Sequence, residues 1–229
     1  MSYTVLIPAA GSGTRMHSET NKLLMPLRNL PVIVHTVKRF EEDKNCEAIY
    51  LATKESERAT FQSLLVFSTK LKGLITGGAR RQDSIYNMLL AMDKESYVMV
   101  HDGARPFVSD IILKSLYDAV KTHGAVICGV APKDTIKCVS EGRVVETIER
   151  STLIQVHTPQ VFKYEILMDA YNNAYSRNLD VTDDAMMVEA LGIDIRVVDS
   201  DYKNIKITTP EDIIIGENII AQNERDMDV

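Results

Sequence analysis

The chain has 229 residues, 45% of them hydrophobic and 25% charged, and its formal net charge is −6. This length predicts a single α/β domain over residues 1–229, large enough to bury a substantial core. The acidic balance argues against a nucleic-acid partner, which needs a concentrated basic surface, but it is compatible with a local basic pocket for phosphates.

Three further features of composition bear on where the protein works. No run of about 18 apolar residues occurs, so we expect no membrane span. Cys46, Cys128 and Cys138 show no metal-ligand spacing, and their odd number fits a reducing compartment better than a disulfide framework. The first four residues lack the basic start of a secretory signal. We therefore expect a cytoplasmic protein.

The first half of the chain alternates short apolar runs with amphipathic segments. The apolar runs predict buried strands at 4–8, 48–52, 73–76, 97–101 and 125–130. Apolar residues at helical spacing predict helices at 31–42, 55–66, 84–92 and 110–123. This alternation indicates βαβ units, and therefore a Rossmann-like, mostly parallel twisted sheet flanked by helices.

The pattern changes after Pro132. Two strand-like runs, 134–140 and 143–150, flank Glu141-Gly142 and predict a protruding β-hairpin arm at about 134–150. The remaining predicted elements are helices at 163–176 and 183–191, strands at 195–198 and 205–208, and a last helix from Pro210.

A glycine-rich segment, Pro-Ala-Ala-Gly-Ser-Gly-Thr-Arg-Met at 8–16, directly follows the first strand. Small residues allow the backbone to approach a ligand closely, and successive N–H groups in such a loop bind anions. Arg15 adds a planar cation that suits phosphate oxygens, and Lys22 adds a second charge. A plain strand-to-helix turn is the alternative. The third glycine of a dinucleotide fingerprint is missing, because Met16 stands there, and so is the Gly-Lys-Ser/Thr ending of a P-loop.

Later segments extend this pattern in a fixed order. They are Gly-Gly-Ala-Arg-Arg-Gln-Asp-Ser at 77–84, His-Asp-Gly-Ala-Arg-Pro at 101–106, Asp-Thr-Ile-Lys at 134–137, Thr-Pro-Gln at 158–160, Thr-Asp-Asp-Ala at 182–185, and Asn-Ile-Lys-Ile-Thr-Thr-Pro-Glu-Asp at 204–212. Together they resemble the 2-C-methyl-D-erythritol 4-phosphate cytidylyltransferases, a family of nucleotidyltransferase type, from residue 4 to about residue 215.

Ribitol 5-phosphate cytidylyltransferases carry much the same segments and are the main alternative. The Pro-Ala-Ala-Gly and Thr-Asp-Asp-Ala segments are more similar to the erythritol family. Two positions depart from it: Asn21-Lys22-Leu23 stands where Pro-Lys-Gln is frequent, and Arg80 stands where an acidic residue is common. Two alternatives belong to other classes of protein. A catalytically silent nucleotide-binding regulator is disfavoured because the charged residues are present. A dinucleotide-binding oxidoreductase is disfavoured by the missing third glycine.

The resemblance implies that a polyol phosphate attacks the α-phosphorus of CTP and that pyrophosphate leaves, with Mg²⁺ or another divalent cation as cofactor. A phosphate monoester is largely dianionic at pH 7 and is already a nucleophile. Positioning and electrostatic stabilisation should therefore dominate catalysis, without a strong general base.

The resemblance also assigns site residues. The catalytic set is Arg15, Lys22, Arg150 and Lys206; the nucleotide-binding set is Ala9, Ala10, Gly11, Gly13, Gly78, Ser84 and Asp102, with Asp102 also the metal ligand; the substrate-binding set is Arg105, Thr135, Thr158 and Thr182.

Some of these assignments have structural alternatives. Ser84 could be only a helix N-cap, Asp102 could cap the next turn, and Arg105 could brace its loop rather than contact the polyol. Arg150 and Thr135 flank the predicted arm, which the resemblance places across a homodimer, so that each would reach the partner's site. A solvated hairpin without a function is the alternative for the arm.

Overall fold

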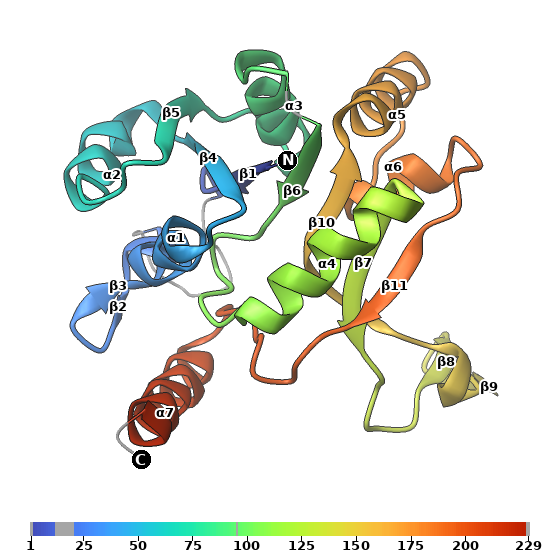
Figure 1. Cartoon of the computed structure of the whole chain (residues 1–229). Helices are drawn as coiled ribbons and strands as arrows, with labels where there is room; N and C mark the ends of the chain where they lie inside the picture. The colour runs from blue at the N-terminus through green and yellow to red at the C-terminus, as the bar shows by residue number, and fades with distance from the viewer. Residues whose placement is uncertain (1, 12–20, 95, 228–229) are drawn as a thin grey trace.

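The structure is a computed structural model, and it describes residues 2–11, 21–94 and 96–227. Its centre is a seven-stranded sheet (Figure 1). In order across the sheet, the strands are β11 (Arg196–Asp199), β7 (Ala125–Val130), β10 (Gln155–Lys163), β6 (Tyr97–Val100), β1 (Tyr3–Pro8), β4 (Cys46–Thr53) and β5 (Leu71–Thr76).

Helices cover both faces of this sheet. The α-helices are α1 (Val32–Glu42), α2 (Arg58–Leu64), α3 (Arg81–Ala91), α4 (Asp110–His123), α5 (Tyr164–Ser176), α6 (Asp184–Glu189) and α7 (Pro210–Met227). Buried side chains of α1, α2 and α4 form one apolar cluster with the sheet, and those of α3, α5 and α6 form another on the opposite face. Figure 1 shows α4 in front of β7 and β10.

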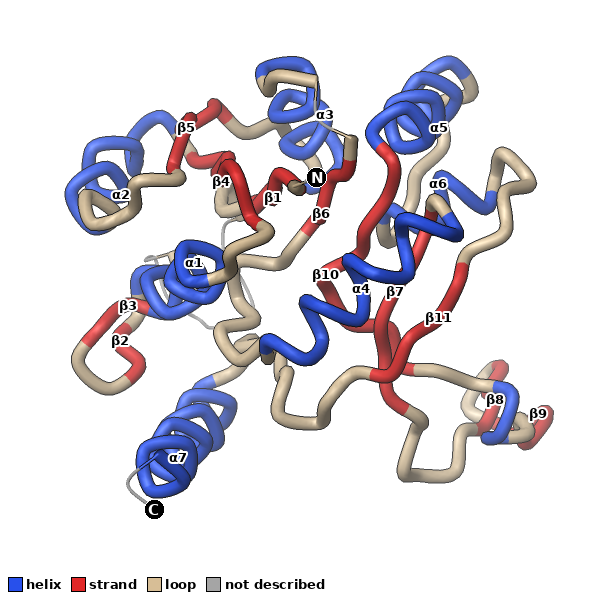
Figure 2. Tube along the Cα trace, in the orientation of Figure 1, coloured by secondary structure: helices blue, strands red, loops and turns tan. Residues whose placement is uncertain are grey.

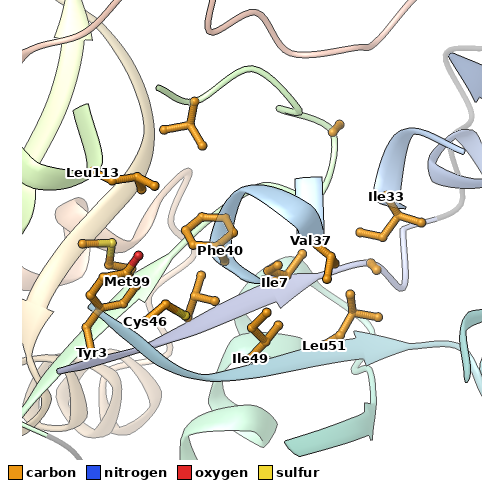
Figure 3. Packing of buried hydrophobic residues seen from close by; sticks show 14 of the residues in the cluster. Tyr3, Ile7, Ile33, Val37, Phe40, Cys46, Ile49, Leu51, Met99 and Leu113 are labelled. Carbon is orange, nitrogen blue, oxygen red and sulfur yellow. The ribbon is translucent and has the colours of Figure 1, made fainter. Parts of the chain in front are cut away.

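Strand β1 shows why the sheet is buried on both faces. Tyr3, Val5 and Ile7 belong to the first cluster and Leu6 to the second, as the alternation of side chains along a strand requires. Figure 3 shows Ile7 close to Phe40 and Val37 of α1. Near-continuous apolar runs are typical of such strands, which explains why the sequence predicted them.

The mostly parallel sheet flanked by helices is confirmed, with one strand that the sequence did not predict. Pairs β1–β4, β1–β6, β4–β5 and β7–β11 are parallel, whereas β10 is antiparallel to both β6 and β7. Pro159 lies inside β10, and a proline argues against a central strand because it has no N–H for the ladder. The register between β10 and β7 shifts between His157 and Val161, and this irregularity accommodates the proline.

The predicted arm is confirmed as the pair β8 (Lys137–Ser140) and β9 (Arg143–Thr147), which projects from the end of β7 (Figure 2). Glu141 and Gly142 form its two-residue turn with φ of 48° and 75°, the positive values that such hairpin turns favour. Every residue of both strands is exposed.

Other boundaries differ from the prediction. The predicted helix at 55–66 is a 3₁₀ turn, η3 (Glu55–Glu57), followed by α2, and α3 begins at Arg81 rather than at 84. The predicted strand at 205–208 was wrong: Ile207 N donates to Ala104 O at 2.8 Å, but no ladder forms in this segment. A short hairpin, β2 (Pro26–Leu27) and β3 (Leu30–Pro31), and two 3₁₀ turns, η2 (Lys22–Leu24) and η4 (Arg150–Thr152), were not predicted. No helix in the described part of the chain is long and apolar enough to span a bilayer.

Candidate active site

A cavity of about 530 Å³ lies where β1, β4 and β6 end. In parallel sheets, the carboxyl ends of the strands face the ligand crevice. The residues that line it are Pro8, Ala9, Ala10, Gly11, Asn21, Lys22, Leu23, Lys54, Gly78, Ala79, Arg80, Arg81, Ser84, Asp102, Gly103, Ala104, Lys206 and Thr208. The structure therefore brings together segments that the sequence analysis selected separately.

The charge of this pocket is opposite to that of the chain. The described lining carries five cationic side chains and one carboxylate, Asp102. Three of the cations are lysines: Lys22, Lys54 and Lys206. An acidic protein of net charge −6 thus concentrates positive charge at one cleft, which suits a polyanion such as a triphosphate.

Asp102 is the centre of an ion-pair network. Its Oδ2 lies 2.8 Å from Lys206 Nζ and 3.8 Å from Arg105 Nε, and its Oδ1 lies 3.3 Å from Arg81 Nε. Burial acts to raise the pKa of Asp102, but the charges of Arg81 and Lys206 outweigh it and hold the pKa well below its ordinary value. The carboxylate is therefore ionised at neutral pH.

Lys22 is positioned by a buried asparagine. Asn21 Oδ1 accepts from Leu23 N at 3.1 Å, which caps η2, and its Nδ2 donates to Ala9 O and to Glu57 Oε2, each at 2.9 Å. Asn21 thus joins the turn that carries Lys22 to the backbone of the glycine-rich segment. This arrangement explains how the chain keeps the lysine although asparagine stands where the family frequently has proline.

The double glycine at 77–78 permits a close approach of two loops. A Cβ on Gly77 would lie 2.3 Å from Ala10 Cβ, and a Cβ on Gly78 would lie 2.3 Å from Asp83 Cβ. Ser84 Oγ accepts from Gly78 N at 3.0 Å and so fixes this loop. The N-cap of α3 is Arg80, so the interpretation of Ser84 as an N-cap was wrong.

Two predicted substrate residues lie behind the pocket rather than in its lining. Arg105 is buried, and its Nη1 donates to Asn204 O at 2.7 Å, which is the bracing role left open by the sequence. Thr158 is also buried, and its Oγ1 accepts from Asp102 N at 2.9 Å. In this chain both residues support the segments that carry Asp102 and Lys206.

Three predicted residues lie apart from the pocket lining. Arg150 is exposed and its Nη1 donates to Lys133 O at 2.6 Å, Thr135 is exposed beside the arm, and Thr182 is exposed with its Oγ1 3.9 Å from Met186 Sδ. Arg15 and Gly13 lie outside the described residues. The other predicted residues line one cavity: Lys22, Lys206, Asp102, Ala9, Ala10, Gly11, Gly78 and Ser84.

Three residues that line the pocket were not predicted as site residues from the sequence: Arg81, Lys54 and Arg80. Lys54 directly follows β4, so the rule that carboxyl ends of strands face the ligand could have identified it. The side chain of Arg80 is 43% exposed and pairs with Asp83 at 2.9 Å. Nothing in the sequence spacing predicts that Arg81 meets Asp102.

The pocket fits a magnesium ion only if the ligand supplies most of its coordination. No group of three or more His, Cys, Asp or Glu side chains that could hold a metal occurs among residues 2–11, 21–94 and 96–227. Mg²⁺ commonly takes one or two carboxylates together with substrate phosphates and waters. Asp102 offers one such carboxylate, and its oxygens now face Lys206 and Arg81.

Comparisons with known proteins agree with this geometry. The family model described as IspD, 2-C-methyl-D-erythritol 4-phosphate cytidylyltransferase, matches residues 3–222. A Bacillus cereus protein of that name is 46% identical over 225 residues, covering 97% of this chain and all of that protein. Among solved structures, the Francisella tularensis enzyme of the same name has a TM-score of 0.81 at 33% identity and covers 94% of this chain and 98% of that one.

The 4-diphosphocytidyl-2C-methyl-D-erythritol synthase of Anaerococcus prevotii has a TM-score of 0.86 at 26% identity, with 96% of both chains covered. The match of the family model extends from β1 into α7 and so includes every segment that lines the pocket. With nearly full-length identity of 46% to a relative, this shows that the chain belongs to the 2-C-methyl-D-erythritol 4-phosphate cytidylyltransferase family.

Proposed function

We propose that this protein transfers the cytidylyl group of CTP to 2-C-methyl-D-erythritol 4-phosphate and releases pyrophosphate, in the synthesis of isoprenoid precursors. The observation that carries the proposal is the cationic pocket at the carboxyl ends of β1, β4 and β6. Membership of the family supports the choice of substrate.

The side chains of the pocket suit this reaction because its barrier is electrostatic. Two polyanions must approach, and negative charge develops on the leaving pyrophosphate. Lys22 and Lys206 line the pocket and would neutralise the triphosphate, while the glycine-rich backbone at 9–11 would lie along it. The proposed role of Arg15 beside the triphosphate rests on the family resemblance alone. The attacking phosphate needs no general base, which agrees with a pocket lining rich in cations.

A divalent cation, Mg²⁺ as the first choice, is part of the proposal. Asp102 would hold it together with phosphate oxygens of CTP, and the ion would withdraw charge from the reacting phosphates. Lys206, now paired with Asp102, would then be available to contact the triphosphate. Ser84 and Gly78 would receive the nucleoside.

The polyol phosphate needs cations of its own, and the proposed one, Arg150, lies outside the pocket of the same chain. Arg150 and Thr135 stand beside the arm, outside the pocket lining. Val139, Val144 and Val145 of the arm are 60–68% exposed, and apolar side chains exposed together commonly mark a protein–protein contact. We therefore propose a homodimer in which each arm reaches the partner's substrate site, with Thr182 on the polyol side.

A substrate comparison tests the proposed activity. Purified protein with CTP and Mg²⁺ should release pyrophosphate only when a polyol phosphate is added, and methylerythritol 4-phosphate should be preferred to ribitol 5-phosphate. Preference for ribitol 5-phosphate would make this chain a CDP-ribitol-forming enzyme. Release of pyrophosphate without any acceptor would contradict both assignments.

Subunit mixing tests the shared site. Arg150→Ala and Lys206→Ala should each be nearly inactive, because each lacks one half of every site. After subunit exchange, about half of the dimers would be mixed and would hold one intact site of two, so roughly a quarter of the wild-type activity should return. Absence of recovery after verified exchange would show that each chain completes its own site.

A further inference from the structure

A row of alternating charges runs from the buried start of α6 into the pocket. Asp184 lies at the start of α6 and is fully buried. Arg81 Nη1 lies 2.8 Å from Asp184 Oδ2, and Arg81 Nε lies 3.3 Å from Asp102 Oδ1. Lys206 ends the row at Asp102 Oδ2. One guanidinium therefore joins a buried carboxylate to the carboxylate of the pocket.

The inner end of this row is rigid. Tyr171 of α5 donates its hydroxyl to Asp184 Oδ1 at 2.6 Å, so both oxygens of Asp184 have partners. Gln160 adds a link to the same helix, because its Oε1 accepts from Ala185 N at 3.1 Å. Buried charges are retained only when paired, and Arg81 is the cation that pairs with Asp184. Arg81 is thereby fixed at its far end.

The outer end of the row of charges, at Asp102 and Lys206, is the part that bears on function. The backbone N–H of Asp102 donates to Thr158, which fixes its main chain, but the carboxylate can still rotate about its side-chain bonds. Arg81 holds one oxygen, and Lys206 holds the other. Under the proposed function Lys206 turns toward the triphosphate when CTP binds. Arg81 is then the close cation that keeps the carboxylate in its orientation.

We infer that Arg81 is a positioning residue: anchored by Asp184, it fixes the Asp102 carboxylate so that this group can receive the divalent cation of metal-bound CTP. The inference rests on the proposed function of the pocket and adds a role for Arg81 and Asp184. A planar guanidinium suits this task because its separate N–H groups reach two carboxylates at once, which the ammonium of a lysine does not do. Partners that orient a metal-binding carboxylate commonly matter nearly as much as the ligand itself.

The test needs a variant that removes Arg81 without leaving a buried carboxylate unpaired. Arg81→Met combined with Asp184→Asn removes both charges together, and the wild-type protein is the reference. Asp184→Asn alone keeps Arg81 but removes its anchor, so it measures what the anchor contributes. Binding is measured without polyol phosphate, so that no turnover occurs. Titration of CTP in the presence of Mn²⁺ gives the affinity for the metal complex, the free Mn²⁺ signal in electron paramagnetic resonance reports the metal, and titration of CTP in EDTA gives the affinity without metal.

We expect the double variant to lose about 10–100-fold in affinity for CTP with Mn²⁺ relative to wild type, and much less in EDTA. Asp184→Asn alone should show a smaller loss of the same kind. Arg81→Lys, which keeps a charge for Asp184, should fold and show the same selective loss. Equal affinity with Mn²⁺ in the double variant and the wild type would overturn the inference. An equal loss with and without metal would also overturn it, because Arg81 would then act by touching the nucleotide. Failure of the wild-type protein to bind CTP would instead refute the proposed function.

Discussion

Replacement of Lys206 by methionine separates the proposed chemistry from the stability of the fold. Lys206 Nζ lies 2.8 Å from Asp102 Oδ2, and its side chain is 37% exposed. Methionine keeps much of the length of the side chain and removes the charge. Asp102 retains Arg81 as a close partner, so the carboxylate is not left without a counter-charge.

The two expected magnitudes differ widely. An ion pair with one partner exposed to this degree contributes at most about 1 kcal/mol to stability, because solvent screens it. The loss of one charged contact to the developing charge of the leaving group costs about 2.7–4 kcal/mol in the transition state, or roughly 10²–10³-fold in turnover. Lys206→Met should therefore be nearly as stable as wild type and almost inactive.

The assay pairs urea unfolding with pyrophosphate release at saturating substrates. Lys203→Met is the matched control, because Lys203 lies on the same segment but does not line the described pocket. Turnover of Lys206→Met within tenfold of wild type would refute the assignment of Lys206 to the triphosphate. A fall in turnover that only parallels a fall in stability, or an equal fall in Lys203→Met, would refute it as well.

Three further predictions concern the framework of the site and the fold. Asn21→Ala removes three hydrogen bonds and should cost about 1–3 kcal/mol in urea unfolding, with weaker CTP binding; unchanged CTP affinity would separate Asn21 from the pocket. Gly77→Ala places a Cβ 2.3 Å from Ala10 Cβ and should destabilise the protein by about 1–3 kcal/mol, and wild-type stability would show that the loops can separate. Burial acts to raise the pKa of Glu41, but hydrogen bonds from 68–70 outweigh it and lower the pKa to about 2. Glu41 therefore stabilises the fold above its unfolded pKa, near 4.5, by about 1 kcal/mol after solvent screening, and this contribution is lost as the pH falls toward 2. Glu41→Gln should remove that part of the pH dependence of stability between pH 7 and 3. A stability profile unchanged from wild type would contradict this prediction.

The arm shows which parts of the fold local sequence decides. Glu141-Gly142 between two strand-like runs predicts a two-residue turn, and positive φ at both residues follows from that turn. The parallel core strands are equally local in origin, since burial on both faces requires continuous apolar runs. By contrast, the interior proline of β10 argues against a strand, and only its neighbours β6 and β7 hold that segment in the sheet.

By itself, the sequence determined the α/β class, the arm, and the segments that carry Lys22, Asp102 and Lys206, because strand burial, turn chemistry and strand ends depend on residues close together in the chain. Only the tertiary structure decided that Arg81 joins Asp102, 21 residues away, to Asp184, 103 residues away. It also decided that Thr158 and Arg105 lie behind the pocket. Such contacts depend on how distant elements pack, and no local periodicity encodes that packing.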